Sequence, residues 1–290
     1  MKVGLGLPIA DPGSLSAWVR RAEDGPFTTL AMLDRLVYHS PEPLVTLAAV
    51  AGATSRIRVM TEVLIAPTRE TPLLAKQAAT LDRISGGRFT LGIGVGVRED
   101  DFRAAGVDYR RRGRRLDEQM AVLRRVWAGE PYGGDGGHGG GIGPIGPAPV
   151  RPGGPEVLFG GFVPATAERV ARWGDGFLGA MFSPEEMGRF FRTVERAWQE
   201  AGRSGGPRLV AQANVALGPD RVVDEARQAV RAYYTFAEYR DRVAEGMLTT
   251  PEAVLRAVSA FGDIGADEVM LYCWSADAGQ VDRVAEVLHR

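Results

Sequence analysis

Two glycines followed at once by a helix start are the residues that point most directly to a bound ligand. The stretch LFGGFVPAT, residues 158–166, ends an apolar run on Gly160 and Gly161 and continues into a helix opened by Pro164. The first N–H groups of a helix have no intrahelical partner, and its dipole favours an anion there. Glycine lets such a group approach the backbone, and Thr166 adds a hydroxyl. The pattern predicts a phosphate-binding turn, with a plain tight turn as the alternative.

A second glycine pattern lies in RFTLGIGVG, residues 88–96, where Gly92, Gly94 and Gly96 alternate with apolar residues. Alternate residues of a strand point to the same side, so these three leave one side bare. A bare side suits either close packing of neighbouring chain or a flat ring lying against the backbone. The pattern is compatible with both.

Polar residues follow another apolar run, FTTLAML, residues 27–33. Asp34 and Arg35 come next, and His39 lies a few residues further on. Asp34 can orient Arg35 or a substrate hydroxyl, or it can form a simple ion pair at the end of the strand. His39 titrates near neutral pH and is our candidate for general acid–base chemistry.

Thiol and metal chemistry have little support in the sequence. Cys273, the single cysteine, lies in the apolar run EVMLYCW and is predicted to be a buried thiol. One cysteine excludes an internal disulfide and fits a reducing compartment. His39, His138 and His289 form no spaced pair with each other or with the cysteine, so we expect no protein-bound metal.

The composition is that of a globular protein with one sizeable core. Of the 290 residues, 45% are hydrophobic and 24% are charged, and the formal net charge is −1. This balance excludes nucleic-acid or membrane partners bound by bulk charge. Met1 leads directly into the strand-like KVGLGLPI without a cleavable signal, and the apolar runs are too short to span a bilayer. We therefore expect a cytoplasmic protein.

Short apolar runs alternate with amphipathic stretches along almost the whole chain, as strands separated by helices do. Eight such units form either a closed (β/α)8 TIM barrel or, as the alternative, an open doubly wound sheet. GLGLPI does not complete the G-x-G-x-x-G fingerprint of the open sheet, so we predict one barrel domain over residues 1–290. The predicted strands are residues 3–9, 27–33, 56–66, 88–96, 157–161, 175–182, 208–217 and 268–274.

A segment dense in glycine and proline, residues 129–156, separates the fourth helix from the fifth strand. The strand–helix pattern resumes after it, so we interpret it as a long insertion loop within the barrel domain. We expect this loop to be a lid over the mouth of the barrel. A single long helical region is predicted over residues 219–262.

Three stretches resemble the bacterial-luciferase-like flavin-dependent oxidoreductases. They are RIRVMTEVLIAPTRETPLLAKQAATLDRISGGRFTLGIGVGVREDDF (56–102), RRRGRRLDEQMAVLRRVW (110–127) and VLFGGFVPATAERVARWGDGFL (157–178). The resemblance runs from Met1 to about residue 200 and continues weakly to the end. It implies a (β/α)8 barrel with insertions that binds reduced FMN, or the deazaflavin coenzyme F420, at the carboxyl ends of the strands.

The resemblance assigns cofactor-binding roles to two groups of residues in the first stretch. Glu62 and Val63 match the family's non-prolyl cis peptide, which forms a bulge behind the central ring of the flavin. Gly94, Val95 and Gly96 match the ledge beside the ring and the ribityl chain.

The resemblance also assigns a phosphate-binding loop. Gly160, Gly161 and Phe162 match this loop, which agrees with the turn predicted from the residues themselves. Arg112 or Arg114 matches an arginine that helps to hold the phosphate.

Departures from the family pattern lie close to the expected site. Asp34 keeps an acid found in luciferases, but Arg35 stands where they have a histidine. Val95 replaces an arginine, and Val163 lies near a position where luciferases have a serine. These changes argue against light emission and against direct transfer of catalytic roles.

The resemblance favours a monooxygenase that uses reduced FMN and O2 to oxygenate a small organic substrate. Hydride transfer with coenzyme F420 and a non-catalytic flavin-binding barrel are the alternatives. No complete nicotinamide fingerprint is present, so we expect a separate flavin reductase as partner, and a homodimer. The expected pocket wall comprises Met32, Met181, Phe182, Tyr272 and Trp274.

Overall fold

The computed structural model describes residues 1–8, 12–133, 142–180, 182–235 and 238–289. Within them, nine parallel strands form one sheet in the order β3-β2-β1-β9-β8-β7-β6-β5-β4, and pairing of β3 with β5 closes it. β3 and β4 are two halves of the third barrel strand, so the fold is the predicted (β/α)8 barrel. The strands are β1 (Lys2–Gly6), β2 (Thr29–Met32), β3 (Arg58–Thr61), β4 (Leu64–Ile65), β5 (Phe89–Gly94), β6 (Glu156–Gly160), β7 (Gly176–Gly179), β8 (Arg208–Val215) and β9 (Glu268–Cys273).

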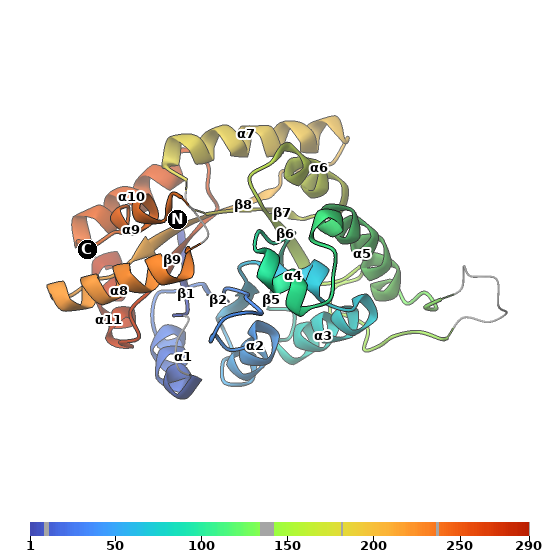
Figure 1. The fold of residues 1–290 in the computed structure, drawn as a ribbon, viewed down its shortest axis with the longest axis horizontal. Coiled ribbons are helices and arrows are strands. Elements are labelled where there is room, and N and C mark those ends of the chain that lie inside the picture. The colour runs from blue at the N-terminus through green and yellow to red at the C-terminus, as the bar shows by residue number, and fades with distance from the viewer. Residues whose placement is uncertain (9–11, 134–141, 181, 236–237, 290) are drawn as a thin grey trace.

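Helices surround the barrel (Figure 1). Several begin with proline in the first turn, where its missing N–H costs no hydrogen bond. The helices are α1 (Leu15–Asp24), α2 (Pro43–Gly52), α3 (Thr71–Ile84), α4 (Glu99–Ala104), α5 (Arg112–Trp127), α6 (Pro164–Trp173), α7 (Pro184–Glu200), α8 (Asp220–Tyr233), α9 (Arg240–Glu245), α10 (Pro251–Asp263) and α11 (Gly279–Leu288).

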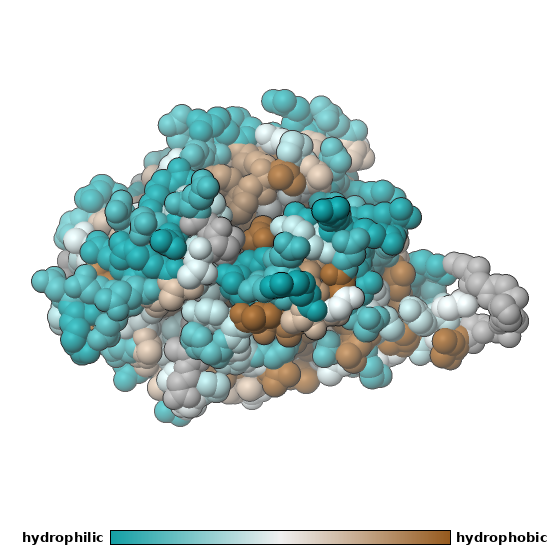
Figure 2. Space-filling model, viewed as in Figure 1, coloured by the Kyte–Doolittle hydropathy of each residue, from teal (hydrophilic) through white to brown (hydrophobic). Residues whose placement is uncertain are grey.

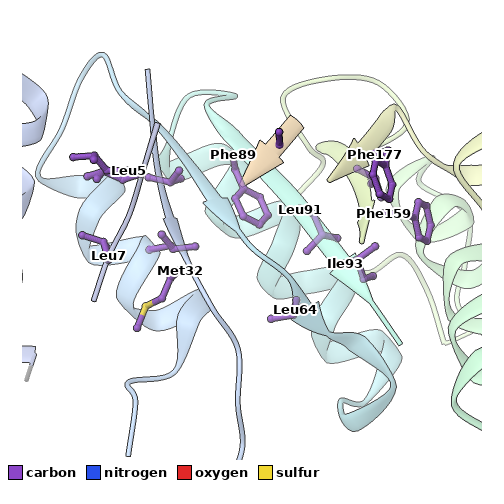
Figure 3. Close-up of a cluster of buried hydrophobic side chains, with 14 of the residues drawn as sticks. Leu5, Leu7, Met32, Leu64, Phe89, Leu91, Ile93, Phe159 and Phe177 are labelled. Carbon is purple, nitrogen blue, oxygen red and sulfur yellow. The ribbon is translucent and has the colours of Figure 1, made fainter. Parts of the chain in front are cut away.

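Apolar side chains pack on both sides of the barrel wall, which explains why the strands are continuous apolar runs. The larger, outer core lies between the strands and the helices. A smaller inner layer fills the interior of the barrel with side chains from several strands: Ala31, Met60, Leu158, Leu178, Val210 and Met270. Figure 3 shows part of the outer core, with Phe89 and Leu91 from β5 beside Phe159 and Phe177 from β6 and β7.

An ion-pair network closes the barrel at the amino-terminal ends of the strands. Arg208 of β8 pairs with Glu156 of β6 and Glu268 of β9. Glu156 also accepts a hydrogen bond from Arg58 at 3.1 Å, and Glu268 accepts one from Thr28 at 2.5 Å. Glu268 is buried and the other charged groups are partly exposed, and the pairing gives the buried carboxylate the partner that it needs. Ligands are therefore expected at the opposite end, where such barrels carry their sites.

The third strand and the long predicted helix are both interrupted. Residues 56–66 divide into β3 and β4 at the peptide bond between Glu62 and Val63. The predicted helix over 219–262 divides into α8, α9 and α10. Thr250 caps α10 through a hydrogen bond to the Ala253 N–H, with Pro251 following, so a new helix begins there.

The glycine-rich segment 129–156 lies at the amino-terminal end of the barrel in its described parts, 129–133 and 142–156. The Val150 N–H donates to Asp82, near the end of α3, at 2.7 Å. Arg151 pairs with Asp175, directly before β7, at 2.9 Å. Figure 1 shows the segment extending past α3 and α5. A helix-to-strand connection lies where the next strand begins, so the expected lid over the mouth is wrong for these residues; residues 134–141 lie outside the described ones.

Candidate functional site

The floor of the barrel mouth, the end where the strands terminate, is formed where β3 passes into β4. The peptide bond between Glu62 and Val63 is cis, as the resemblance implied. A Cβ at Gly94 would lie 2.8 Å from Val63 Cγ2, and one at Gly160 would lie 2.6 Å from Val63 Cγ1. Val63 therefore occupies the room that the two glycines of β5 and β6 leave. We call Val63, Gly94 and Gly160 the ledge.

The bare side of β5 is filled by the chain itself. A Cβ at Gly92 would collide with the carbonyl oxygen of Thr61. Gly96 has a φ of +73°, and a Cβ there would lie 2.6 Å from Ile65. Val95 is half-buried and packs against the core. Of the two interpretations of these glycines, close packing is the one found.

The turn between β6 and α6 presents backbone rather than side chains at a helix start. No side chain caps α6, whereas α7 has a full capping box formed by Ser183 and Glu186. Gly161 has a φ of +149°, and a Cβ there would lie 2.6 Å from the Thr166 hydroxyl oxygen. An uncapped helix start beside a backbone without Cβ atoms fits a phosphate group.

The two arginines expected to assist this turn differ. Arg112 donates to the Gly96 carbonyl at 3.2 Å and to the Tyr109 carbonyl at 2.9 Å, so it supports the chain just beyond β5. The Arg114 side chain is 74% exposed and pairs with Glu118 one helical turn away. Arg112 is thus attached to the mouth, whereas Arg114 belongs to the solvated face of α5.

Asp34 fixes the segment that follows the cis bond. Its carboxylate is buried at the end of β2 and accepts a hydrogen bond from the Ile65 N–H at 2.7 Å. Arg69 binds both oxygens, at 2.5 and 3.0 Å, and also reaches Glu42 at 3.0 Å. Of the two roles expected for Asp34, orientation of Arg35 is not found. Asp34 forms an ion pair with Arg69 at the end of the strand instead.

Arg35 is instead held by the first turn of α4, which follows the loop after β5. Its Nε donates to Asp101 at 2.8 Å, and Asp101 accepts the N–H groups of Leu36 and Val37 at 3.1 and 2.7 Å. The Arg35 guanidinium lies 5.5 Å from the centre of the Tyr38 ring. Within the described residues, Arg35 Nη1 is buried without a hydrogen-bond partner.

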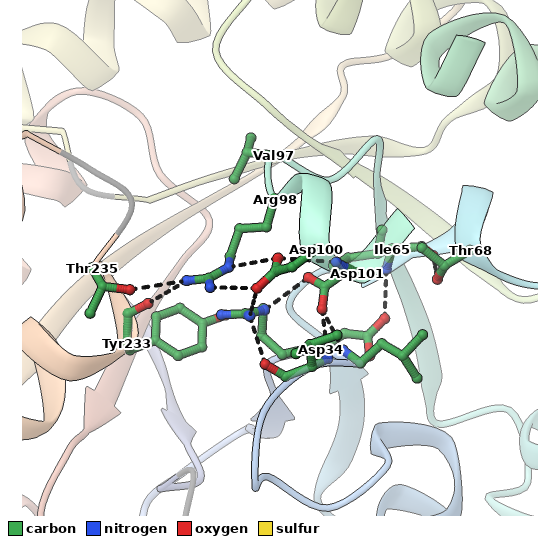
Figure 4. Close-up of polar contacts among 12 residues, drawn as sticks. Asp34, Ile65, Thr68, Val97, Arg98, Asp100, Asp101, Tyr233 and Thr235 are labelled. Atoms are coloured by element: carbon green, nitrogen blue, oxygen red, sulfur yellow. Dashed lines mark hydrogen bonds and ion pairs between the residues drawn. The ribbon is translucent and has the colours of Figure 1, made fainter. Parts of the chain in front are cut away.

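Arg98 joins this loop to the end of α8 (Figure 4). It pairs with Asp100 at 2.7 Å, and its Nη1 donates to the Tyr233 carbonyl at 3.3 Å and to the Thr235 hydroxyl at 3.4 Å. Segments from β2, β4, β5 and α8 are therefore tied together by charged side chains around one side of the mouth.

His39 lies away from these buried groups. It is exposed, and its ring contacts that of Tyr38 with 4.2 Å between centroids. The structure does not bring the predicted acid–base residue to the ledge. Cys273 is the buried thiol that we predicted, and burial raises its pKa to about 12.

An aromatic cluster lines the opposite side of the mouth from the ledge strands β5 and β6. It consists of Tyr233 and Tyr234 at the end of α8 and Tyr272 and Trp274 at the end of β9. Trp274 donates to the Asn214 side chain at 2.8 Å. Burial raises the pKa of Tyr234 and Tyr272 well above the usual tyrosine value, so their hydroxyls stay neutral. The walls on this side of the mouth are largely apolar, and the Arg35 guanidinium lies 5.6 Å from the centre of the Tyr233 ring.

The other residues expected in the pocket wall do not lie together with the aromatic cluster. Met32 is buried in the core, and Met181 lies outside the described residues. Phe182 is half-buried, contacts Phe162 edge to face at 4.8 Å, and lines a pocket of about 310 Å³ between the start of α7 and α9.

Exposed apolar side chains gather on the loops at this end of the barrel. They follow β2, β5 and β6, and their exposed fractions are 42–56%; they are Leu36, Val37, Val97, Phe162 and Val163. Figure 2 shows brown, apolar surface among teal in the middle of the face viewed. Large apolar side chains left exposed together are typical of an entrance for an apolar ligand.

Within the described part of the chain, no group of three or more His, Cys, Asp or Glu side chains is placed to hold a metal ion. None of its helices has both the length and the apolar character needed to cross a membrane.

Several residues of this site were missed in the sequence. Arg69 follows the third strand directly, and Asp101 belongs to the charged stretch after the fourth, so charge beside a strand end was the available signal. Tyr233 carried no such signal, because only folding brings the end of α8 to the mouth.

Known proteins resemble this chain in sequence. The family profile described as luciferase-like monooxygenase matches residues 3–289. An uncharacterised protein of Mycobacterium tuberculosis (strain ATCC 25618 / H37Rv) is 33% identical over 164 residues, 56% of each chain. The F420-dependent glucose-6-phosphate dehydrogenase of Beutenbergia cavernae is 32% identical over 177 residues, 58% of this chain and 52% of that protein. These matches span about half the length of each curated relative.

Solved structures share the fold. An F420-dependent secondary alcohol dehydrogenase in complex with an F420–acetone adduct superposes with a TM-score of 0.83 at 18% identity, over 99% of this chain and 97% of the other. The oxygenating constituent of 3,6-diketocamphane monooxygenase from Pseudomonas putida, in complex with FMN, gives 0.76 at 16% identity, over 99% and 96%.

Proposed function

Because the chain belongs to the luciferase-like monooxygenase family, we propose that it oxygenates a small, largely apolar organic substrate with reduced FMN and O2. The observation that carries the proposal is the continuity of the ledge with the uncapped start of α6. Gly160 packs against Val63, and the next residue, Gly161, opens the turn into the helix. A ring site and a phosphate site therefore adjoin along one stretch of backbone.

Each part of this arrangement has a role in holding the cofactor. The N–H groups at the start of α6 bind the phosphate, with the Thr166 hydroxyl beside them. Val63 would contact the ring, and Arg112 holds the chain at Gly96 in place. When bound, reduced FMN supplies the electrons that activate O2. The protein's contribution is binding, orientation and exclusion of water.

The aromatic cluster forms the substrate side of the mouth. Its buried rings exclude water from the space above the ledge, and the neutral hydroxyls of Tyr234 and Tyr272 leave no charge there. Asp34 and Arg35 act as positioning residues, because their charges are engaged by Arg69 and Asp101. This pocket suits an apolar molecule better than a phosphorylated sugar.

Hydride transfer with coenzyme F420 is the second candidate, favoured by the 32% identity to the F420-dependent dehydrogenase. Both candidates place a tricyclic ring on the ledge and an anionic tail at α6. In the FMN case we propose that a separate reductase supplies the reduced cofactor and that the chain works as a homodimer.

Titration of the purified protein with FMN, with anaerobically reduced FMN and with F420, followed by fluorescence or calorimetry, tests the proposal. We expect reduced FMN to bind and O2 uptake to be coupled to an apolar substrate. Binding of F420 without FMN would replace the first candidate by the second. Binding of neither would refute both.

A further inference from the structure

A carboxyl group without a partner lies below the barrel mouth, at Glu62. The residue is 2% exposed, and within the described residues neither carboxyl oxygen has a hydrogen-bond partner. A buried polar group left in this state destabilises the fold, and native proteins contain few of them. Its presence at the end of β3, next to Val63 of the ledge, therefore indicates a role toward a bound molecule.

The two residues of the cis bond face different sides of the mouth. Val63 packs against Gly94 and Gly160, on the side of β5 and β6. Glu62 lies two residues beyond Met60 of β3, whose side chain packs in the inner layer with Met270 of β9, so the two share a side. When ionised, its carboxyl would raise the pKa of Tyr234 and Tyr272, which belong to the aromatic cluster beside α8 and β9. Glu62 thus faces the side of the mouth assigned to the substrate.

We propose that Glu62 is a substrate-binding residue whose carboxyl group donates a hydrogen bond to a carbonyl or hydroxyl oxygen of the substrate. The inference rests on the proposed function, because it takes the aromatic side of the mouth as the substrate site. It adds a substrate class: compact, largely apolar, uncharged molecules that carry one accepting oxygen.

The protonation state of Glu62 supports a donor role. Burial raises the pKa of its carboxyl well above the usual range, and the charge of Glu268 raises it further. A neutral carboxyl has one O–H to donate, whereas a carboxylate has none. Anionic substrates are disfavoured, because an anion would lose its hydration among the aromatic walls and the charge of Arg35, beside Tyr233, is already paired with Asp101.

Stability of the cofactor-free protein gives the first test, with Glu62→Met and Glu62→Gln as variants and Glu268→Gln as control. Glu268 is also a buried glutamate inside the barrel, but it is paired with Arg208 and Thr28. We expect Glu62→Met to raise the Tm by about 3 °C and Glu268→Gln to lower it. A lowered Tm for Glu62→Met would show that the carboxyl stabilises the fold and would overturn the inference.

Infrared spectroscopy at pH 7 gives the second test. We expect a carbonyl band of a protonated carboxyl that disappears in Glu62→Gln. Acetophenone should shift this band, whereas α-methylstyrene, which has the same shape without the oxygen, should not. Equal shifts, no shift or no band would overturn the inference.

The kcat/KM values of the wild type and the two Glu62 variants give the third test. With a turned-over substrate, we expect Glu62→Met to lower kcat/KM about tenfold and Glu62→Gln, whose amide still donates, to lower it about threefold or less. Equal kcat/KM in wild type and Glu62→Met would count against the inference. Failure of wild type to bind FMN or F420 would instead refute the proposed function, while the stability and infrared results on Glu62 would stand.

Discussion

We expect Asp34→Asn to lower the free energy of unfolding, because Asp34 positions the chain and takes no direct part in the reaction. The carboxylate is 3% exposed in its side chain, and it binds the Ile65 N–H and both terminal nitrogens of Arg69, whose side chain is 19% exposed. The asparagine oxygen can still accept from Ile65, so the loss falls on the charge interaction with Arg69.

The magnitude follows from burial. Removing one partner of a fully buried ion pair costs about 3–5 kcal/mol, because the other charge stays buried. Arg69 is partly solvated and keeps Glu42 at 3.0 Å, so part of its charge stays compensated. We expect Asp34→Asn to lower the free energy of unfolding by about 2–3 kcal/mol. Cofactor affinity should fall as well, because β4 carries the chain away from Val63.

Urea unfolding of the cofactor-free protein measures this loss, and Arg114→Gln is the matched control. The Arg114–Glu118 pair is 74% and 56% exposed, so its loss should cost at most about 0.5 kcal/mol. A double-mutant cycle with Arg69→Gln should recover most of the loss as coupling. If Asp34→Asn leaves the unfolding free energy unchanged while kcat collapses, Asp34 is catalytic and the positioning role is refuted.

Three further predictions follow from single contacts. Gly161→Ala should weaken cofactor binding about tenfold or more, because the new Cβ meets Thr166; Gly129→Ala, also at positive φ but with open space around it, should leave binding unchanged in the same titration. Arg112→Ala should weaken binding about tenfold and Arg114→Ala less than twofold; equal effects would contradict the difference in their contacts. Burial opposes ionisation of Glu23, but the N–H groups of Ser55, Arg56 and Ile57 lower its pKa to about 2. Its contribution is thus complete above the unfolded value of 4.5 and is lost as pH falls toward 2. Glu23→Gln should remove about 1 kcal/mol at pH 7 and progressively less as the pH falls toward 2, as urea midpoints would show.

The barrel was predictable because each strand is a short apolar run between helices, and that pattern depends only on neighbouring residues. The turn at Gly160 and Gly161 was visible for the same reason. The position of the 129–156 segment was predicted wrongly, although the order of elements contains the answer: a connection from a helix to the next strand lies at the amino-terminal end of the barrel.

The ion pairs of the mouth were beyond the sequence because they join distant positions. Asp34 and Arg69 are 35 residues apart, and Arg35 and Asp101 are 66 apart. Asp34 and Arg35 are neighbours, so the sequence favoured a link between them. Both residues lie just beyond the end of β2, and each finds its partner on a different segment: Asp34 binds Arg69 after β4, and Arg35 binds Asp101 in α4.

Arg35, a departure from the luciferase pattern, and the buried Glu62 have a common physical consequence. Arg35 replaces a histidine; its charge is matched by Asp101, and neither N–H of its buried Nη1 has a hydrogen-bond partner among the described residues. Glu62 is likewise buried with its oxygens unpaired. Two donor groups with unused hydrogen-bonding capacity at the ends of the adjacent strands β2 and β3 would both be satisfied by oxygen atoms of a ligand. An apolar molecule with one or two accepting oxygens meets that requirement, which is why substrate trials should begin with ketones and alcohols rather than hydrocarbons or acids.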